Sequence, residues 1–94
     1  MSVTVLFFSS KSCAYCPGVQ RIVESICQQR GYAFRLQKLD DPNPDRRSVI
    51  MASAAAYTVS SLPTVVVVVN GQPQAMFVGS NAGEKLAQWV GNEH

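Results

Sequence analysis

Hydrophobic residues recur along this chain with two different spacings, one typical of strands and one typical of helices. Residues 3–8 are rich in β-branched and aromatic side chains with little alternation, which predicts a strand buried on both faces. A second group of hydrophobic residues falls at the spacing of one face of an amphipathic helix. Its members are Val19, Ile22, Val23, Ile26 and Cys27. Gly31 follows this face at a place where the helix can end.

The middle of the chain predicts a second strand and a second helix. Residues 32–36 alternate apolar and polar side chains, as a strand with one solvent-exposed face does. Residues 40–44 (DDPNP) are a turn cluster, in which Asn43 can cap a helix whose first position is Pro44. Through its alanine-rich stretch, that helix is expected to run to about Tyr57.

The last third of the chain predicts a β-hairpin and a helix. Residues 64–69 form an aliphatic strand, and residues 75–78 return as its partner after the strong turn signal Asn70-Gly71. Asn81, with Glu84 three positions later, resembles a helix capping box. The buried stripe of this last helix is expected to consist of Leu86, Trp89 and Val90.

The predicted order of elements is β-α-β-α-β-β-α. The first two strands must be parallel because a helix joins them, whereas the last two form an antiparallel hairpin. We therefore expect an α/β fold with a mixed four-stranded sheet and helices on both of its faces. Residues 1–94 contain no linker, repeat or low-complexity segment, so we expect a single domain.

Composition excludes several classes of function. The net charge is only +2 and the basic residues are scattered, which argues against a nucleic-acid partner. The longest aliphatic run, residues 65–69, is far too short to cross a bilayer. The start of the chain has no basic region typical of a signal peptide, so we expect a cytoplasmic protein. In a reducing cytosol, paired cysteines more often serve catalysis or metal binding than a structural disulfide.

Cys13 and Cys16 are the residues that carry candidate chemistry. They could hold a metal, form a structural disulfide or perform reversible redox chemistry. Residues three apart in a helical turn face the same way, close enough for a disulfide. Cys13 precedes the helix and is the candidate nucleophile, whereas Cys16 points along the apolar face and is the candidate resolving thiol. The positive end of the helix, the Lys11 ammonium and the Tyr15 hydroxyl could all stabilise a thiolate at Cys13.

These motifs resemble the thioredoxin superfamily. The CAYC sequence at residues 13–16 is similar to the CPYC of glutaredoxins, whereas the second half, with Leu62-Pro63-Thr64 and Gly79, resembles the end of thioredoxins. The resemblance implies a thioredoxin-like fold with a redox-active Cys13–Cys16 disulfide and no bound cofactor or metal. It also implies that Pro63 is cis, beside the cysteine pair.

The resemblance further implies where a substrate binds. The Leu62 backbone would pair with a substrate segment or with glutathione as an added strand. Ser80 and Asn81 stand where glutaredoxins hold the glutamyl end of glutathione. The residues expected to support the site or to contact substrate or glutathione are therefore Lys11, Tyr15, Leu62, Pro63, Thr64, Gly79, Ser80 and Asn81.

The function implied is thiol–disulfide exchange by a monomer acting on protein disulfides, with ribonucleotide reductase as a client. Ser12 stands where thioredoxins have a tryptophan, and Asn81-Ala82 where glutaredoxins have an acidic pair. The electron source therefore stays open between glutathione and a flavin-dependent thioredoxin reductase. The alternatives are a non-catalytic thioredoxin-like binding subunit and a glutaredoxin that carries an iron–sulfur cluster.

Two other residues with ligating side chains are interpreted as structural or silent. Cys27 lies on the apolar helix face and is expected to be a small core residue. His94 is the last residue and is expected to have no functional role. A zinc site, which would need two ligands besides Cys13 and Cys16, is therefore not expected.

Overall fold

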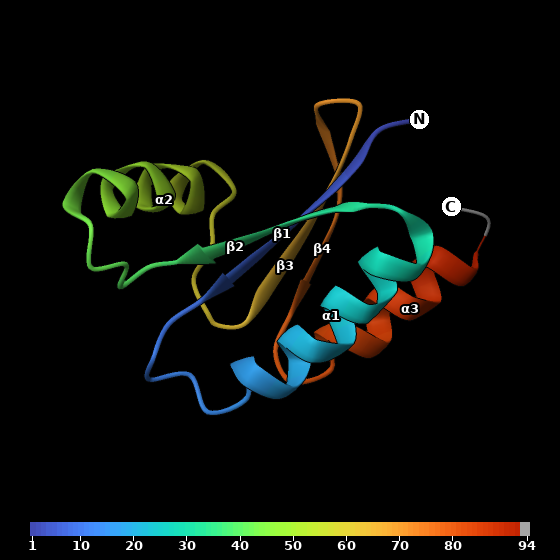
Figure 1. Ribbon diagram of the computed structural model, residues 1–94, viewed down its shortest axis with the longest axis horizontal. Helices are drawn as coiled ribbons and strands as arrows, with labels where there is room; N and C mark the ends of the chain where they lie inside the picture. Colours follow the sequence, from blue (N-terminus) through green and yellow to red (C-terminus); the bar gives the residue numbers. More distant parts are fainter. Residues whose placement is uncertain (93–94) are drawn as a thin grey trace.

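A four-stranded sheet with strand order β2-β1-β3-β4 runs through the computed structural model, which describes residues 1–92 (Figure 1). Along the chain the elements are β1 (Val3–Ser9), α1 (Cys16–Arg30), β2 (Ala33–Lys38), α2 (Pro44–Ala56), β3 (Thr64–Val69), β4 (Gln72–Val78) and α3 (Ala82–Gly91). Strands β1 and β2 are parallel, and the other two neighbouring pairs are antiparallel. The predicted α/β fold, element order and mixed sheet are confirmed.

The helices cover the two faces of the sheet unequally. Helices α1 and α3 lie side by side on one face, and α2 alone lies on the other (Figure 1). Alternate residues of β1 divide between two cores, so that Phe7 packs beneath α1 and α3 whereas Phe8 packs beneath Ile50 of α2. Both phenylalanines are fully buried, as expected of a strand covered on both faces, although Thr4 and Leu6 on the α2 face are partly exposed.

The predicted helix boundaries follow from local chemistry. Helix α1 ends at Gly31, which adopts a left-handed conformation with φ of 70° that few other residues tolerate. The Asn43 side chain caps α2 by accepting a hydrogen bond of 3.0 Å from the Arg46 backbone N–H. Pro44 follows at the first helical position, where a missing N–H costs nothing. Both predictions are confirmed.

Asp41 reinforces the start of α2. Its carboxylate accepts hydrogen bonds from the Asn43 backbone N–H (2.9 Å) and from the Arg46 side chain (3.3 Å). These bonds, together with the nearby positive charges, lower the pKa of Asp41 because they favour its ionised form.

The hairpin forms as expected but is longer than the sequence pattern predicts. Asn70 and Gly71 both have positive φ (51° and 81°), as a tight two-residue turn requires. Strand β4 begins at Gln72 rather than Ala75, because backbone pairing continues directly from the turn. Pro73 is tolerated there because β4 is an edge strand with an irregular register nearby.

The predicted capping box at the start of α3 is wrong. Asn81 occupies the cap position but makes no side-chain capping bond. Its amide oxygen instead accepts a hydrogen bond of 3.1 Å from the Ser80 hydroxyl. A backbone bond from the Ala82 N–H to the Gly79 carbonyl (3.0 Å) closes the turn before the helix.

Helices α1 and α3 approach each other closely at a glycine. Ile22 was expected to be buried on the inner face of α1, but it is 46% exposed and lies at the boundary with α3. A Cβ atom added to Gly83 would stand 2.8 Å from Cγ2 and 3.1 Å from Cβ of Ile22. The absence of a side chain at Gly83 therefore permits the contact between the two helices.

A pair of glycine substitutions in α3 tests this contact. Gly83→Ala should lower the free energy of unfolding by about 1 kcal/mol, because overpacking against Ile22 outweighs the gain in helix propensity. Gly91→Ala, at a position with no atom within 4 Å of the added Cβ, should raise it by a few tenths of a kcal/mol. Urea unfolding of both variants measures the difference, and a stabilising Gly83→Ala would contradict the close approach.

Candidate active site

The two paired cysteines lie where β1 passes into α1. After Ser9 the chain leaves the sheet, and two tight turns bring it to the helix. The Cys13 backbone N–H donates to the Ser10 carbonyl (3.2 Å), and the Cys16 N–H donates to the Cys13 carbonyl (3.3 Å). The second turn places Cys13 just outside the first residue of the helix, Cys16.

The loop is also tied to the neighbouring strand. The Asp40 carboxylate accepts a hydrogen bond of 2.8 Å from the Lys11 backbone N–H. The Leu39 N–H donates to the Ser9 carbonyl at 2.9 Å. These bonds hold the cysteine loop to the segment that follows β2.

Cys13 and Cys16 form a disulfide, with their Cα atoms 5.4 Å apart. Cys16 is only 2% exposed, whereas Cys13 is partly exposed. The first turn of α1 contains no acidic residue and has no side-chain cap, so the positive end of the helix dipole is not neutralised there. The structure thus has the asymmetry that the sequence suggested, with one sulfur near the surface and one behind it.

A hollow of about 370 Å³ adjoins Cys13 on the side of β3. It is lined by Ser10, Ser12, Cys13, Leu39, Val59, Ser60, Ser61 and Leu62. The peptide bond between Leu62 and Pro63 is cis, as the resemblance implied. Leu62 and Cys13 therefore border one surface hollow, although 49 positions separate them in the sequence.

The residues after the cis bond support this hollow from within. Thr64 is buried, and its hydroxyl donates a hydrogen bond of 2.6 Å to the Ser61 carbonyl. The Gly79 N–H donates to the Pro63 carbonyl at 2.9 Å, with Gly79 at a φ of 98°. Pro63 and Thr64 are thus inner residues of the site, and their side chains are not exposed to substrate.

The remaining predicted site residues lie around this centre at different positions. Tyr15 is 67% exposed at the cap of α1, directly before Cys16. Ser80 and Asn81 are exposed at the start of α3, and neither lines a hollow that adjoins Cys13. Lys11 lines a second hollow beside the disulfide.

This second hollow, of about 200 Å³, contains residues that the sequence analysis missed. It is lined by Ser9, Ser10, Lys11, Cys13, Cys16, Pro17, Gln20 and Lys38. Lys38 comes from the end of β2, where it pairs in register with Ser9 at the end of β1. The parallel arrangement of these strands could have predicted this proximity, because parallel strands end at the same edge of a sheet.

Cys27, the third cysteine, is buried and unpaired on the inner face of α1. Its burial, and to a lesser degree the nearby Glu24 carboxylate, raise the pKa of the Cys27 thiol to about 11. A protonated thiol is a poor nucleophile and a poor metal ligand at neutral pH. This agrees with its interpretation as a core residue.

Neither a metal cluster nor a membrane span is found in the part of the chain that the structure describes. Within residues 1–92, no three His, Cys, Asp or Glu side chains are grouped as metal ligands. Over the same residues, no helix has the length and apolar character needed to cross a bilayer. His94 lies outside the described residues, so the prediction made for it stays a prediction.

Comparison with known proteins was made by family sequence model, by curated sequence and by solved structure. The sequence model of the family described as Thioredoxin matches residues 1–92. Comparison with curated proteins finds no match. Among solved structures, thioredoxin from Fasciola hepatica superposes with a TM-score of 0.78 at 23% identity, over 99% of this chain and 82% of that one.

Two further solved structures have the same fold at lower identity. Thioredoxin O2 from Arabidopsis thaliana, in its oxidised state, gives a TM-score of 0.79 at 15% identity and covers 98% of this chain and 75% of that one. Mitochondrial thioredoxin 3 from Saccharomyces cerevisiae, also oxidised, gives 0.78 at 20% identity, covering 97% and 78%. Nearly the whole chain is therefore matched by part of a longer protein in each case.

The raised pKa of Cys27 predicts a loss of stability in alkaline solution. Below about pH 9 the thiol is protonated in both folded and unfolded chains, and between about pH 9 and 11 only the unfolded chain ionises. The free energy of unfolding should therefore fall across this window. By about pH 10.5 the contribution of Cys27 should be about 1–2 kcal/mol.

The measurement compares urea unfolding with and without Cys27→Ala. Both proteins carry Cys13→Ser and Cys16→Ser, so that the other two sulfurs neither titrate nor exchange. The Cys27→Ala protein should lose less stability between about pH 8 and 10.5 than its parent. Identical pH dependence in the two proteins would contradict the shift.

Proposed function

Because this chain belongs to the Thioredoxin family, we propose that it is a thiol–disulfide oxidoreductase that reduces protein disulfides through Cys13 and Cys16. One observation carries the proposal. Cys13 is accessible at the positive end of α1, and Cys16 is bonded to it from a buried position. This arrangement suits the two different steps of disulfide exchange.

In the first step, the Cys13 thiolate attacks one sulfur of the substrate disulfide. A bond forms between Cys13 and that sulfur, the substrate S–S bond breaks, and the other substrate sulfur leaves as a thiolate that takes up a proton. In the second step, Cys16 loses its proton and attacks the Cys13 sulfur. The second substrate thiol is released, the Cys13–Cys16 disulfide forms, and two electrons have passed to the substrate.

The positive end of α1 acts on the first step, in which Cys13 is the attacking thiolate. A lowered pKa increases the fraction of thiolate at Cys13, but intrinsic nucleophilicity falls with the pKa and offsets most of that gain. In the second step Cys16 attacks the Cys13 sulfur, so the leaving group is the substrate thiolate and not Cys13. Because Cys16 belongs to the same turn, this step is intramolecular and proximity accelerates it.

The hollow that joins Cys13 and Leu62 is the proposed binding surface for the substrate segment. An extended substrate chain would pair with the Leu62 backbone, next to the sulfur that attacks it. Lys11 and Tyr15 lie beside the cysteine pair, and Gly79, Ser80 and Asn81 lie at the start of α3. We propose these as the outer contacts of the substrate, or of glutathione where it is the co-substrate.

The location, oligomeric state, client protein and electron source are proposed from the resemblance of the sequence motifs to thioredoxins and glutaredoxins. We propose a cytoplasmic monomer that donates electrons to protein disulfides, ribonucleotide reductase among them. Its own disulfide would be reduced again by glutathione or by a flavin-dependent thioredoxin reductase. The Tyr15 position and the CAYC sequence favour glutathione, whereas the family match favours the reductase.

Serine substitutions separate the roles of the two sulfurs. With dithiothreitol as reductant, Cys13→Ser should abolish reduction of a model protein disulfide, because no nucleophile remains at the surface. Cys16→Ser, reduced beforehand and then freed of dithiothreitol, should retain the first step and accumulate a mixed disulfide, visible as a mass increase equal to the mass of the substrate. The matched control is Cys27→Ser, which should keep turnover because Cys27 is remote from the exchange. Full activity in Cys13→Ser would overturn the assignment of the nucleophile.

The same assay identifies the electron source. Dithiothreitol is replaced in one arm by glutathione with its reductase, and in the other by thioredoxin reductase, each with NADPH. We expect turnover in at least one arm. Turnover with dithiothreitol but in neither arm would overturn both proposed donors without affecting the exchange chemistry.

A further inference from the structure

The hollow on the α1 side of the disulfide is distinct from the one that adjoins Leu62. Both Cys13 and Cys16 line it, and its only charged lining residues are Lys11 and Lys38. No carboxylate lines it. An exposed, positively charged surface therefore lies directly beside the sulfur that is proposed to bond the substrate.

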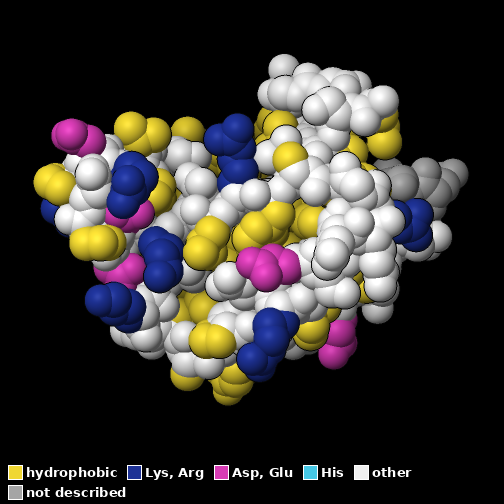
Figure 2. Space-filling view, in the orientation of Figure 1, with side chains coloured by type: hydrophobic (Ala, Val, Ile, Leu, Met, Phe, Trp, Pro, Cys, Tyr) yellow, Lys and Arg dark blue, Asp and Glu magenta, His cyan; other side chains and the backbone are white. Residues whose placement is uncertain are grey.

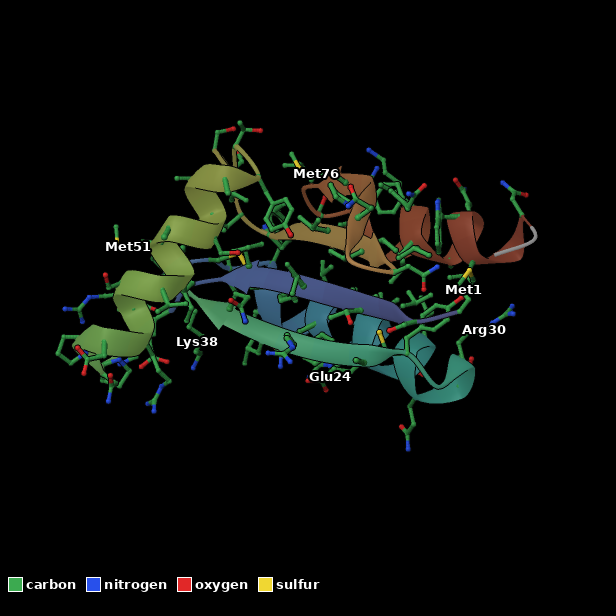
Figure 3. The ribbon with its side chains drawn as sticks, turned by 90° about the horizontal axis from the view of Figure 1, so that it is seen from above. Met1, Glu24, Arg30, Lys38, Met51 and Met76 are labelled. Atoms are coloured by element: carbon green, nitrogen blue, oxygen red, sulfur yellow. A yellow bond between two sulfur atoms is a disulfide. The ribbon has the colours of Figure 1, made fainter. Side chains whose placement is uncertain are left out.

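The fold brings the two lysines together from different parts of the chain. Lys38 is the last residue of β2 and pairs in register with Ser9, and Lys11 follows Ser9 by two positions. Figure 3 shows Lys38 at the end of β2 that is nearer to α2, whereas Arg30 and Met1 lie at the opposite end of the molecule. Both lysines therefore lie at the end of the sheet where the cysteine loop begins.

Neighbouring acidic groups offset this charge only in part, because none of them lines the hollow. Within residues 1–92 the only ion pair is Arg46 with Asp41. Among these residues Lys11 and Lys38 form none, although Lys38 is close enough to Asp41 to help lower the pKa of that carboxyl group. Asp40 reduces the local charge, but its carboxylate accepts the Lys11 backbone N–H and does not line the hollow. The Glu24 carboxylate accepts a hydrogen bond of 3.0 Å from Gln20, one turn along α1.

The protein carries a net charge of only +2, so its surface as a whole is not strongly basic. On the face shown in Figure 2, acidic and basic side chains are interspersed around α2 and the adjoining end of β2. A broad basic surface would attract any polyanion. Two lysines beside a reactive sulfur instead favour a substrate with a negative charge close to its disulfide. The size of the hollow, about 200 Å³, also suits a single side chain.

We propose that this hollow binds an acidic side chain next to the substrate cysteine, so that the protein prefers disulfides in acidic protein segments. This inference rests on the proposed function. When Cys13 bonds the substrate sulfur, residues adjacent to that cysteine must lie over one hollow or the other. The Leu62 side offers Leu39 and Val59, which suit apolar residues, and the Lys38 side suits Asp or Glu.

The test uses two short peptides, each closed by an internal disulfide, that differ only in having Glu or Gln beside each cysteine. Reduction of both by dithiothreitol gives their intrinsic reactivity ratio, by which the protein's kcat/KM values are divided. Because the same Cys13 thiolate attacks both peptides, the corrected ratio does not depend on the pKa of Cys13. It reports only on recognition of the carboxylates.

The wild-type protein should prefer the Glu peptide by roughly tenfold at low salt, and Lys38→Gln and Lys11→Gln should each lower the corrected ratio by roughly threefold. The matched control is Arg35→Gln, which removes the same charge from β2. Arg35 lines a different hollow, shared with Asp41 and Asp45, and should leave the ratio unchanged. Raising the ionic strength to about 1 M should bring the wild-type ratio close to one.

The outcomes separate this proposal from the one on which it rests. Equal reduction of both peptides, or an unchanged ratio in Lys38→Gln, would overturn the acidic preference and leave the exchange activity standing. If the lysine variants slow only recycling by glutathione, the hollow recognises glutathione and the proposal for protein segments is wrong. If the wild-type protein reduces neither peptide, the proposed function itself fails.

Discussion

The position of Cys13 just outside the first turn of α1 is the constraint on which the rest of the site depends. A sulfur there is close to the positive end of the helix, and no acidic residue of that first turn weakens the field. One turn further in, the same sulfur would be as buried as Cys16. The chemistry of the pair therefore depends on where the helix begins.

The fold fixes that starting point from several directions. Helix α1 packs against both the sheet and α3, and its close approach to α3 requires a glycine at position 83. The loop before it is held by backbone bonds within the turn and by the Asp40 carboxylate on the Lys11 N–H. The packing of α1 and the hydrogen bonds of the loop before it together keep the two sulfurs within disulfide distance.

Parallel pairing of β1 and β2 explains why a site forms at this edge. It brings the cysteine loop and the end of β2 to the same place, while the segment before β3 brings Leu62 to the other side of Cys13. As a result, Cys13 stands between two hollows of different character. A substrate chain crossing it would meet serine and aliphatic side chains on one side and lysines on the other.

Much of this architecture could be predicted because it is encoded in local sequence. The Asn43 cap, the Gly31 stop and the Asn70-Gly71 turn each depend on the conformational preferences of one or two residues. The cysteine pair was recognisable for the same reason, since both sulfurs lie within one turn. The cis bond came only from the resemblance to a family, because most bonds before proline are trans.

The features that could not be predicted arise from tertiary structure. Lys38 reaches the site through strand register, which a reading of one segment at a time does not give. Asn81 has the composition of a cap, but its amide oxygen accepts the Ser80 hydroxyl and a backbone turn closes the helix start. Ile22 fits the hydrophobic spacing of α1, yet it lies at the boundary with α3 beside Gly83 and is half exposed.

The most direct test of this account is a titration of the thiolate absorbance of the fully reduced protein. The account predicts that one thiol ionises well below its ordinary pKa, and that this step disappears in Cys13→Ser but persists in Cys16→Ser. A reduced protein in which no thiol ionises below that ordinary value, or in which the low step belongs to Cys16, would contradict it.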